Sequence, residues 1–412
     1  MIKNKDFIIL FLGRLITNFG DSIYLIATML LVFSLSGSTF YTGLALFFTS
    51  STAIVQIILS PILNRINMKK FLIVTQIIQG VLLLFIPYLH TTGNLKVYHV
   101  LIIMPIISFL NQLVYPGQLA LLPKIVDSKD LVKANSLFGI AYQGSDAIFN
   151  FLGGIIITTF GFIWAYYIDS ITFFINAILF LFLSKVVSTP CSNEKSKKDS
   201  IKNYFSELKE GIIFWKNSPL KSLLFGVIFI NLAATAIYAA LPEFSRTSTY
   251  YGVLLSASGI GVLLGSMLSN LEILKSIKLG FLYIMFILII SLCWMGMIFI
   301  NNDSLISKLI VFALFFIGWV LIGILNIYSQ TVIQMSTPRD KVTIVLSAML
   351  GLSTALSPLG ALGTSFMSRY YDNKVVIFSA TFLILIIGIY WLFNESIKNI
   401  ESLKRIGGKN YE

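Results

Sequence analysis

The sequence contains little charge and very few cysteine or histidine residues. Only 12% of its 412 residues are Asp, Glu, Lys or Arg, about half the share found in an average soluble domain. Its two cysteines and two histidines predict neither a disulfide nor a metal site. No glycine-rich phosphate loop ending in Lys is present. These absences exclude a soluble enzyme, a disulfide-stapled secreted domain and a chain that uses ATP directly, and we expect no cofactor.

Long apolar runs take the place of the missing charge. Hydrophobic residues make up 57% of the chain, and its mean hydropathy is +0.87. The runs do not alternate with period two, which argues against an outer-membrane barrel. One membrane-spanning helix takes roughly 20 apolar residues. Twelve such segments can be marked, at 7–34, 40–63, 71–89, 97–122, 134–159, 162–184, 220–241, 249–271, 279–300, 306–333, 342–367 and 374–394.

We therefore predict an all-α integral membrane protein with twelve transmembrane helices in two six-helix halves related by pseudo-two-fold symmetry. The expected parts are an N-terminal bundle (1–185), a cytoplasmic linker (186–219), a C-terminal bundle (220–396) and a cytoplasmic tail (397–412). Apolar residues of the linker between 200 and 215 share one helical face. This spacing predicts an amphipathic helix on the inner membrane surface, with a regulatory docking helix as the alternative.

The basic residues are concentrated on one predicted side of the membrane. The net charge is +12, but no continuous basic face with interleaved aromatic residues suggests a nucleic-acid partner. With the N-terminus inside, the inner segments hold 24 Lys and Arg residues and the outer loops hold 5. This bias predicts a cell-membrane protein with both termini in the cytoplasm.

Short motifs give the chain a family resemblance. The loop 60–70 reads SPILNRINMKK and is similar to the Gly-x-Leu-Ala-Asp-Arg-x-x-Arg-Lys signature of the major facilitator superfamily, in which Arg65, Lys69 and Lys70 match. Further pieces resemble the branch that holds macrolide efflux pumps, the enterobactin exporter and a lysophospholipid transporter. These pieces are Gly13-Arg14, Gly20-Asp21-Ser22, residues 131–136 and residues 207–211. The resemblance implies two halves around a midplane substrate site that opens to each side in turn.

The sequence departs from the family pattern at three points. Ser60, Asn64 and Met68 replace signature residues in the loop 60–70. Asn150 stands where the antiporter motif carries a Pro before its glycine pair, and span 97–122 has Asn111-Gln112 in place of a buried Arg. The last two departures concern the proton relay rather than the fold.

Four charged residues fall inside predicted spans, where charge is costly and is usually functional or paired. Asp21 and Asp146 each lie about halfway along their spans. A carboxyl group away from water holds a proton more readily, so Asp21, with Asp146 as partner or alternate, is the proton-coupling candidate. A helix–helix hydrogen bond is the alternative for each. We expect Asp169 to be a structural charge.

Arg14 is expected to be a gate or structural charge. It precedes Asp21 by seven residues, or about 10.5 Å of a regular helix, so no direct ion pair is expected. Its side chain would instead snorkel to the inner surface or hold an inner gate. In the loop 60–70, Arg65, Lys69 and Lys70 are expected mainly to fix topology, and the resemblance implies that this loop also latches an inner gate.

Polar and aromatic side chains of several spans are candidates for the substrate cavity, which we expect to be mostly apolar with a few orienting groups. A packing hydrogen bond is the alternative for each of them. These candidates are Asn18, Tyr24, Gln112, Tyr115, Asn231, Tyr238 and Asn326.

These observations predict a secondary active transporter, and not an enzyme. We expect a monomeric, proton-coupled exporter of an amphiphilic small molecule, such as a macrolide drug or a secreted siderophore. A lipid or lysophospholipid transporter is the alternative within the same class, favoured by a pocket that opens sideways to the bilayer. The alternative from another class is a non-transporting membrane sensor or scaffold.

Overall fold

The computed structural model of the chain is built from helices, with no β-strand among the residues described. The structure describes residues 4–63, 66–126, 134, 137–138, 141, 146–184, 206, 209, 212–213, 215, 220–301, 303–337, 342–403 and 405. The chain divides into two compact units. The first comprises residues 1–201 and 245–256, and the second comprises residues 202–244 and 257–412.

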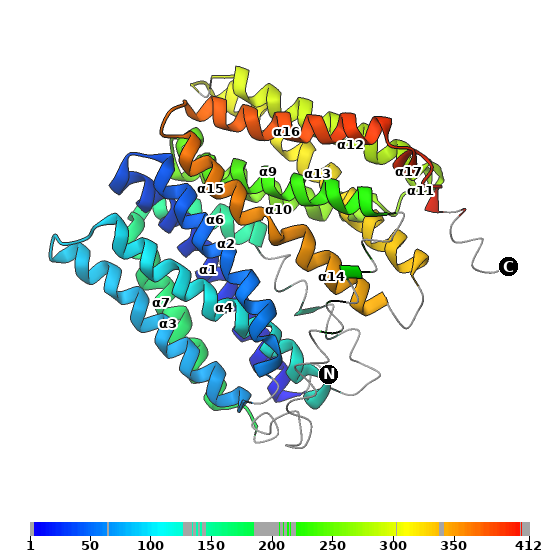
Figure 1. The fold of residues 1–412 in the computed structure, drawn as a ribbon. Helices are drawn as coiled ribbons and strands as arrows, with labels where there is room; N and C mark the ends of the chain where they lie inside the picture. The colour runs from blue at the N-terminus through cyan, green and yellow to red at the C-terminus, as the bar shows by residue number, and fades with distance from the viewer. Residues whose placement is uncertain are drawn as a thin grey trace. The chain divides into compact units, whose positions relative to one another are not determined.

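The first unit is a bundle of long apolar helices. They are α1 (Lys5–Ser36), α2 (Thr39–Leu63), α3 (Met68–Thr91), α4 (Val97–Ile125), α6 (Asp146–Phe160) and α7 (Phe162–Leu181). Helix α1 packs against α2, α4, α6 and α7, and α3 lies along α7 (Figure 1). Because α1 contacts four neighbouring helices, its polar side chains can meet partners from several directions.

The second unit is assembled in the same way. Its helices are α9 (Lys221–Ser245), α10 (Ser248–Leu268), α11 (Glu272–Ser276), α12 (Leu279–Gly296), α13 (Leu305–Ser336), α14 (Val342–Ala355), α15 (Ser357–Met367), α16 (Asn373–Phe393) and α17 (Glu395–Lys398), and a 3₁₀ turn, η5 (Met297–Phe299), follows α12. The start of α10 belongs to the first unit. Helix α12 packs against both α13 and α16.

Small residues let helices approach closely within the second unit. A Cβ atom added at Gly265 of α10 would overlap the carbonyl oxygen of Val320 in α13. Conversely, a Cβ atom at Gly323 of α13 would overlap the carbonyl oxygen of Val262 in α10. Lipid supplies no hydrophobic driving force between apolar helices, so this close backbone packing holds the pair together.

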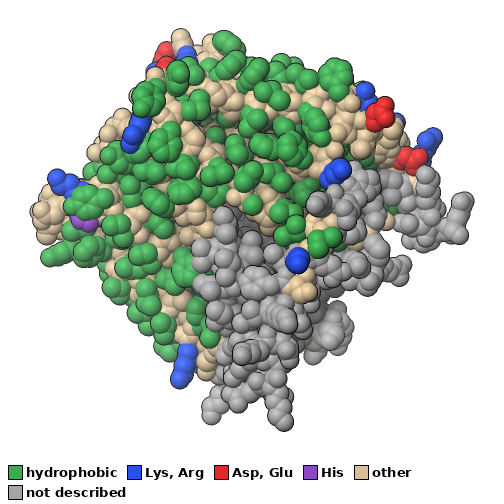
Figure 2. Space-filling view, in the orientation of Figure 1, with side chains coloured by type: hydrophobic (Ala, Val, Ile, Leu, Met, Phe, Trp, Pro, Cys, Tyr) green, Lys and Arg blue, Asp and Glu red, His purple; other side chains and the backbone are tan. Residues whose placement is uncertain are grey.

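The helices have the length and composition of membrane spans. Within the described residues, nine helices are long and apolar enough to cross a bilayer. Hydrophobic side chains cover much of the face in Figure 2, while many charged ones lie toward its margins. Large apolar side chains such as Ile102, Ile171 and Phe382 are exposed, as suits a surface in contact with acyl chains. The prediction of an all-α integral membrane protein is confirmed.

Most of the predicted span boundaries fall close to the helix ends. The start of the predicted span 134–159 lies in a stretch that is mostly outside the described residues, and α6 begins at Asp146. The predicted span 342–367 is divided at Leu356 into α14 and α15. Pro358 lies in the first turn of α15. Proline has no backbone N–H, which is harmless in the first turn of a helix, but it cannot donate the hydrogen bond that would continue α14 into α15. The carbonyl oxygen of Ser353 would normally accept a hydrogen bond from the N–H four residues later, which falls at this interruption. The side chain of Asn231 in α9 donates to that oxygen (3.0 Å).

The predicted amphipathic helix lies largely outside the described residues. Of the stretch 200–215, the structure describes positions 206, 209, 212, 213 and 215. Trp215 is buried against α14, and its indole Nε1 donates to the carbonyl oxygen of Val345 (3.0 Å). This end of the predicted linker is therefore anchored to the second unit.

Candidate functional site

Helix α1 carries an ion pair that the sequence argument did not expect. Arg14 Nη2 lies 4.0 Å from Asp21 Oδ2, and Arg14 also donates to Asn18 Oδ1. The spacing of seven residues is large for two Cα atoms, but the extended Arg side chain runs along the helix and covers the gap. Arg14 is only 4% exposed, so the prediction that it snorkels to the membrane surface is wrong.

A chain of amide side chains leads to the Asp21 carboxylate. Gln76 donates to Gln79 (3.2 Å), Gln79 donates to Asn111 (2.7 Å), and Asn111 donates to Asp21 Oδ1 (2.8 Å). The amides thus connect α3 and α4 to α1, and each amide donates to the next member of the series in the direction of the carboxylate; Gln79 also donates to the carbonyl oxygen of Ile107 (3.3 Å). Such an aligned series polarises in one direction and stabilises negative charge at its end.

The two members of the ion pair differ in their access to the outside. Asp21 is 23% exposed, whereas Arg14 is 4% exposed. The guanidinium group also lies 5.4 Å from the centre of the Tyr115 ring on α4. The first unit therefore holds a buried cation behind a partly accessible carboxylate.

Asp169 on α7 lies close to the same part of α1. A Cβ atom added at Gly20 would overlap Asp169 Oδ1 and Thr172 Oγ1. Thr172 Oγ1 donates to Asp169 Oδ1 (3.2 Å), and the Asp169 side chain is completely buried. The glycine before Asp21 therefore lets a second carboxyl group reach the α1 backbone.

The predicted cavity residues of the first unit fall into two groups. Asn18 is 2% exposed and donates to the carbonyl oxygen of Ala141 (2.5 Å). Tyr24 is 5% exposed and packs edge-on against Tyr166 of α7 (5.7 Å between ring centres). In this structure neither offers surface to a ligand, because both are used in helix packing. Gln112 and Tyr115 are half-buried.

The three candidates of the second unit also differ. Asn231 bonds the backbone of α14 as described above, and Tyr238 packs 5.5 Å from the Trp319 ring. Tyr238 also forms a side-chain hydrogen bond with Ser258. Asn326 is exposed on α13. Asn231 and Tyr238 thus have packing partners, which is the alternative that their sequence left open.

The basic residues Lys69 and Lys70 of the loop 60–70 differ in their contacts. Lys69 Nζ donates to the carbonyl oxygens of Leu181 (2.7 Å) and Leu183 (2.5 Å), which places its charge at the C-terminal end of α7. Lys70 is exposed. Arg65 lies outside the described residues, and so does the side chain of Asp146, whose backbone begins α6.

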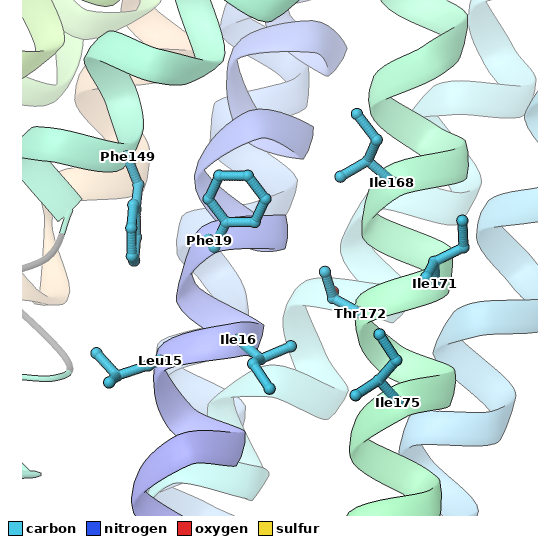
Figure 3. Close-up of a pocket in the computed structure, with 8 residues that line it drawn as sticks. All are labelled: Leu15, Ile16, Phe19, Phe149, Ile168, Ile171, Thr172 and Ile175. Carbon is cyan, nitrogen blue, oxygen red and sulfur yellow. The ribbon is translucent and has the colours of Figure 1, made fainter.

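A shallow apolar groove of about 490 Å³ lies on the first unit between α1, α6 and α7 (Figure 3). Its lining residues are Leu15, Ile16, Phe19, Phe149, Ile168, Ile171, Thr172 and Ile175. Thr172, which bonds Asp169, supplies the one polar side chain in this lining. Ile171 and Ile175 are exposed. Among the described residues, no cluster of His, Cys, Asp or Glu could hold a metal ion.

Sequence reasoning missed part of the polar network. Gln76 and Gln79 are fully buried in an apolar span, yet neither was a candidate. In addition, Asn176 of α7 donates to Thr17 of α1 (2.6 Å). An amide inside an apolar run is itself a signal, because a polar group at membrane depth needs a partner.

Comparison with known proteins agrees with this arrangement of apolar helices. The sequence matches the Major Facilitator Superfamily over residues 10–361. The chain belongs to the major facilitator superfamily. The resemblance inferred from the loop 60–70 and the motifs of the first span is therefore confirmed, and this superfamily member is a multi-pass membrane transporter by family.

Several relatives of this superfamily member are known by sequence. The MFS-type transporter YfiS of Bacillus subtilis (strain 168) is 23% identical over 409 residues, which cover 96% of this chain and 94% of YfiS. The enterobactin exporter EntS of Salmonella typhimurium (strain LT2) is 24% identical over 397 residues, covering 92% of this chain and 91% of EntS.

Solved structures share the fold at low identity. The nucleoside transporter NupG superposes with a TM-score of 0.68 at 13% identity, covering 93% of this chain and 98% of NupG. An inward-facing, unoccupied bacterial homologue of the human lysosomal transporter Spinster also gives a TM-score of 0.68, at 12% identity, covering 96% of each chain. These likenesses identify the major facilitator fold.

Proposed function

We propose that this protein is a proton-driven exporter of an amphiphilic small molecule. The observation that carries the proposal is the Arg14–Asp21–Asn111 cluster, in which a partly exposed carboxylate is held by a buried guanidinium and an aligned amide. A charge of this kind inside an apolar bundle is costly and is retained for ion or substrate handling. Asp21 is its accessible member and hence the coupling candidate, with Asp146 as partner or alternate.

Competition at Asp21 supplies the coupling in this proposal. The ionised carboxylate pairs with Arg14 and accepts from Asn111. Protonation removes the charge that orients both partners, so the network must rearrange. If the substrate binds better to one arrangement of the network and the proton favours the other, binding of one opposes binding of the other. This competition is what proton–substrate exchange requires.

Export, rather than uptake, is supported by the similarity to EntS, an enterobactin exporter. We propose that both termini lie in the cytoplasm, on the positive-inside distribution of Lys and Arg. The candidate substrates are drugs such as macrolides and secreted metabolites such as siderophores. Three of the predicted cavity residues have side chains that a substrate could contact: Gln112 and Tyr115 are half-buried, and Asn326 is exposed.

One observation favours a lipid or lysophospholipid as the transported molecule. The groove between α1, α6 and α7 is almost entirely apolar and is flanked by exposed isoleucines, which suits an acyl chain. A transporter for a double-chained or single-chained lipid would use such a lateral surface. Transfer of a fluorescent lysophospholipid between the leaflets of proteoliposomes tests this alternative.

The export proposal is tested by accumulation of labelled macrolides and siderophores in cells with and without the protein. We expect lower accumulation in expressing cells and loss of this difference with a protonophore. Asp21→Asn should abolish the difference, whereas Asp303→Asn, at an exposed position outside the spans, should preserve it. Export that persists unchanged in Asp21→Asn would overturn the role of Asp21. No export of any compound, with no lipid transfer, would favour a sensor or scaffold.

A further inference from the structure

The carboxyl group of Asp169 has no charged partner in the described part of the chain. It is completely buried in α7. Its Oδ1 accepts from Thr172 of the same helix, and its Oδ2 has no hydrogen-bond partner. The ion pairs of the described residues do not include it. A buried carboxylate without a cation is so costly that the group takes up a proton instead.

Asp21 has the opposite surroundings. Its carboxylate is 23% exposed, lies 4.0 Å from Arg14 and accepts from Asn111 at 2.8 Å. These are the partners of an ionised group. Two acids on neighbouring helices therefore favour different protonation states, which is the arrangement by which proteins separate a proton donor from a proton acceptor.

The two acids interact because the residue before Asp21 is glycine. Asp169 Oδ1 occupies the space that a side chain at position 20 would fill. Asp169 interacts electrostatically with Asp21 and Tyr24 of α1 and with Tyr166 of its own helix. The described polar groups buried on α3, which lies along α7, are Thr75, Gln76 and Gln79, and none of them titrates. Asp21 is thus the acidic neighbour of Asp169 on these helices.

We propose that Asp169 is the resident proton carrier of the first unit and that Asp21 is the carboxylate through which its proton leaves and returns. In the transfer, the O–H bond at Asp169 breaks and an O–H bond forms at Asp21. The pair keeps one negative charge throughout, and that charge moves from the accessible acid to the buried one. Arg14 then faces a neutral Asp21 in place of a carboxylate. The proton transfer is thereby coupled to a rearrangement of α1. This inference rests on the proposed proton coupling and identifies a second residue in it.

Infrared spectroscopy of the purified full-length protein, in a detergent that contains no ester or acid carbonyl group, tests the resting state without any substrate. A protonated carboxylic acid has a carbonyl-stretching band that a carboxylate lacks. We expect this band near neutral pH in the unsubstituted protein, its loss in Asp169→Asn, and its retention in Asp21→Asn. Asparagine closely matches the neutral acid in shape, so the fold should persist. A band that survives in Asp169→Asn, with none assignable to Asp169, would overturn the proposal.

Hydrogen–deuterium exchange of the same band tests the route and does not require a variant at Asp169. After transfer to heavy water, the Asp169 band should shift about a hundredfold more slowly in Asp21→Asn than in the unsubstituted protein, because a positioned proton-transfer group contributes at least about that factor. Asp303→Asn should exchange at the unsubstituted rate. Equal rates in all three proteins would exclude Asp21 as the route.

These outcomes separate the inference from the export proposal. The expected bands and exchange rates, found in a protein that exports none of the tested compounds, would support the proton pair and reject the export function as stated. In an active exporter, Asp169→Asn should move substrate without responding to the proton gradient. Active export by Asp169→Asn with an unchanged pH profile would instead show that the role of Asp169 is structural.

Discussion

The side chain of Lys69 is expected to contribute to stability at the end of a helix. Its ammonium group donates to the carbonyl oxygens of Leu181, the last residue of α7, and of Leu183 just beyond it, where the helix dipole presents partial negative charge. We expect Lys69→Met to lower the free energy of unfolding by about 1–2 kcal/mol. Thermal unfolding of the purified protein in detergent measures the loss. Lys70→Met, at an exposed neighbour, is the control and should be nearly neutral.

The buried ion pair should show strong coupling between its members. Removing one partner of a buried pair leaves the other uncompensated and costs about 3–5 kcal/mol. We therefore expect Arg14→Gln to destabilise the protein markedly and the double variant with Asp21→Asn to be less destabilised than Arg14→Gln alone. A double-mutant cycle of unfolding free energies measures the coupling. Additive effects of the two substitutions would contradict the pairing.

Between helices, the contact of α1 with α7 depends on the absence of a side chain at one position. A methyl group at Gly20 would overlap Asp169 Oδ1 and Thr172 Oγ1, so these two side chains must turn away or α1 and α7 must separate to admit it. We expect Gly20→Ala to destabilise the protein by about 1–3 kcal/mol, as overpacking does. Gly363→Ala in α15 is the matched control, because no atom lies within 4 Å of the added Cβ there. Equal unfolding temperatures for both variants would show that the contact between α1 and α7 at Gly20 accommodates a methyl group without loss of stability.

Element boundaries were largely predictable because apolar length alone defines a span. The prediction could not place the interruption at Leu356, although Pro358 is visible in the sequence, because a helix can continue past a proline with a kink. Nor could it supply the Arg14–Asp21 pair, which depends on the path of a long side chain, or the aligned amides of Gln79 and Asn111, which depend on how α3 and α4 face α1. Pairings across helices require a superposition that one sequence does not contain.

For the whole molecule, the distribution of Lys and Arg predicts orientation. We expect the loop between α3 and α4 to lie outside the cell and the loop before α3 to lie inside. In a background with Cys191→Ser and Cys293→Ser, a membrane-impermeant maleimide should label Asn94→Cys in intact cells. It should label Lys70→Cys only after lysis. Both positions are exposed in the structure, so the reverse pattern would invert the topology.

The hydrogen bond between Lys69 and the end of α7 can form only late in the synthesis of the chain. Its carbonyl partner Leu181 lies 112 residues later in the chain, and at ribosomal speeds of about 5–20 residues per second it is made about 6–22 s afterwards. While α3 is being inserted, the ammonium group has no helix end to bind. In the predicted orientation, we expect its charge at that stage to help keep the preceding loop in the cytoplasm. Once α7 has been inserted, the same ammonium group can bind the end of α7. We therefore expect this lysine to act twice during biogenesis, first on the orientation of the loop and then on the stability of the bundle.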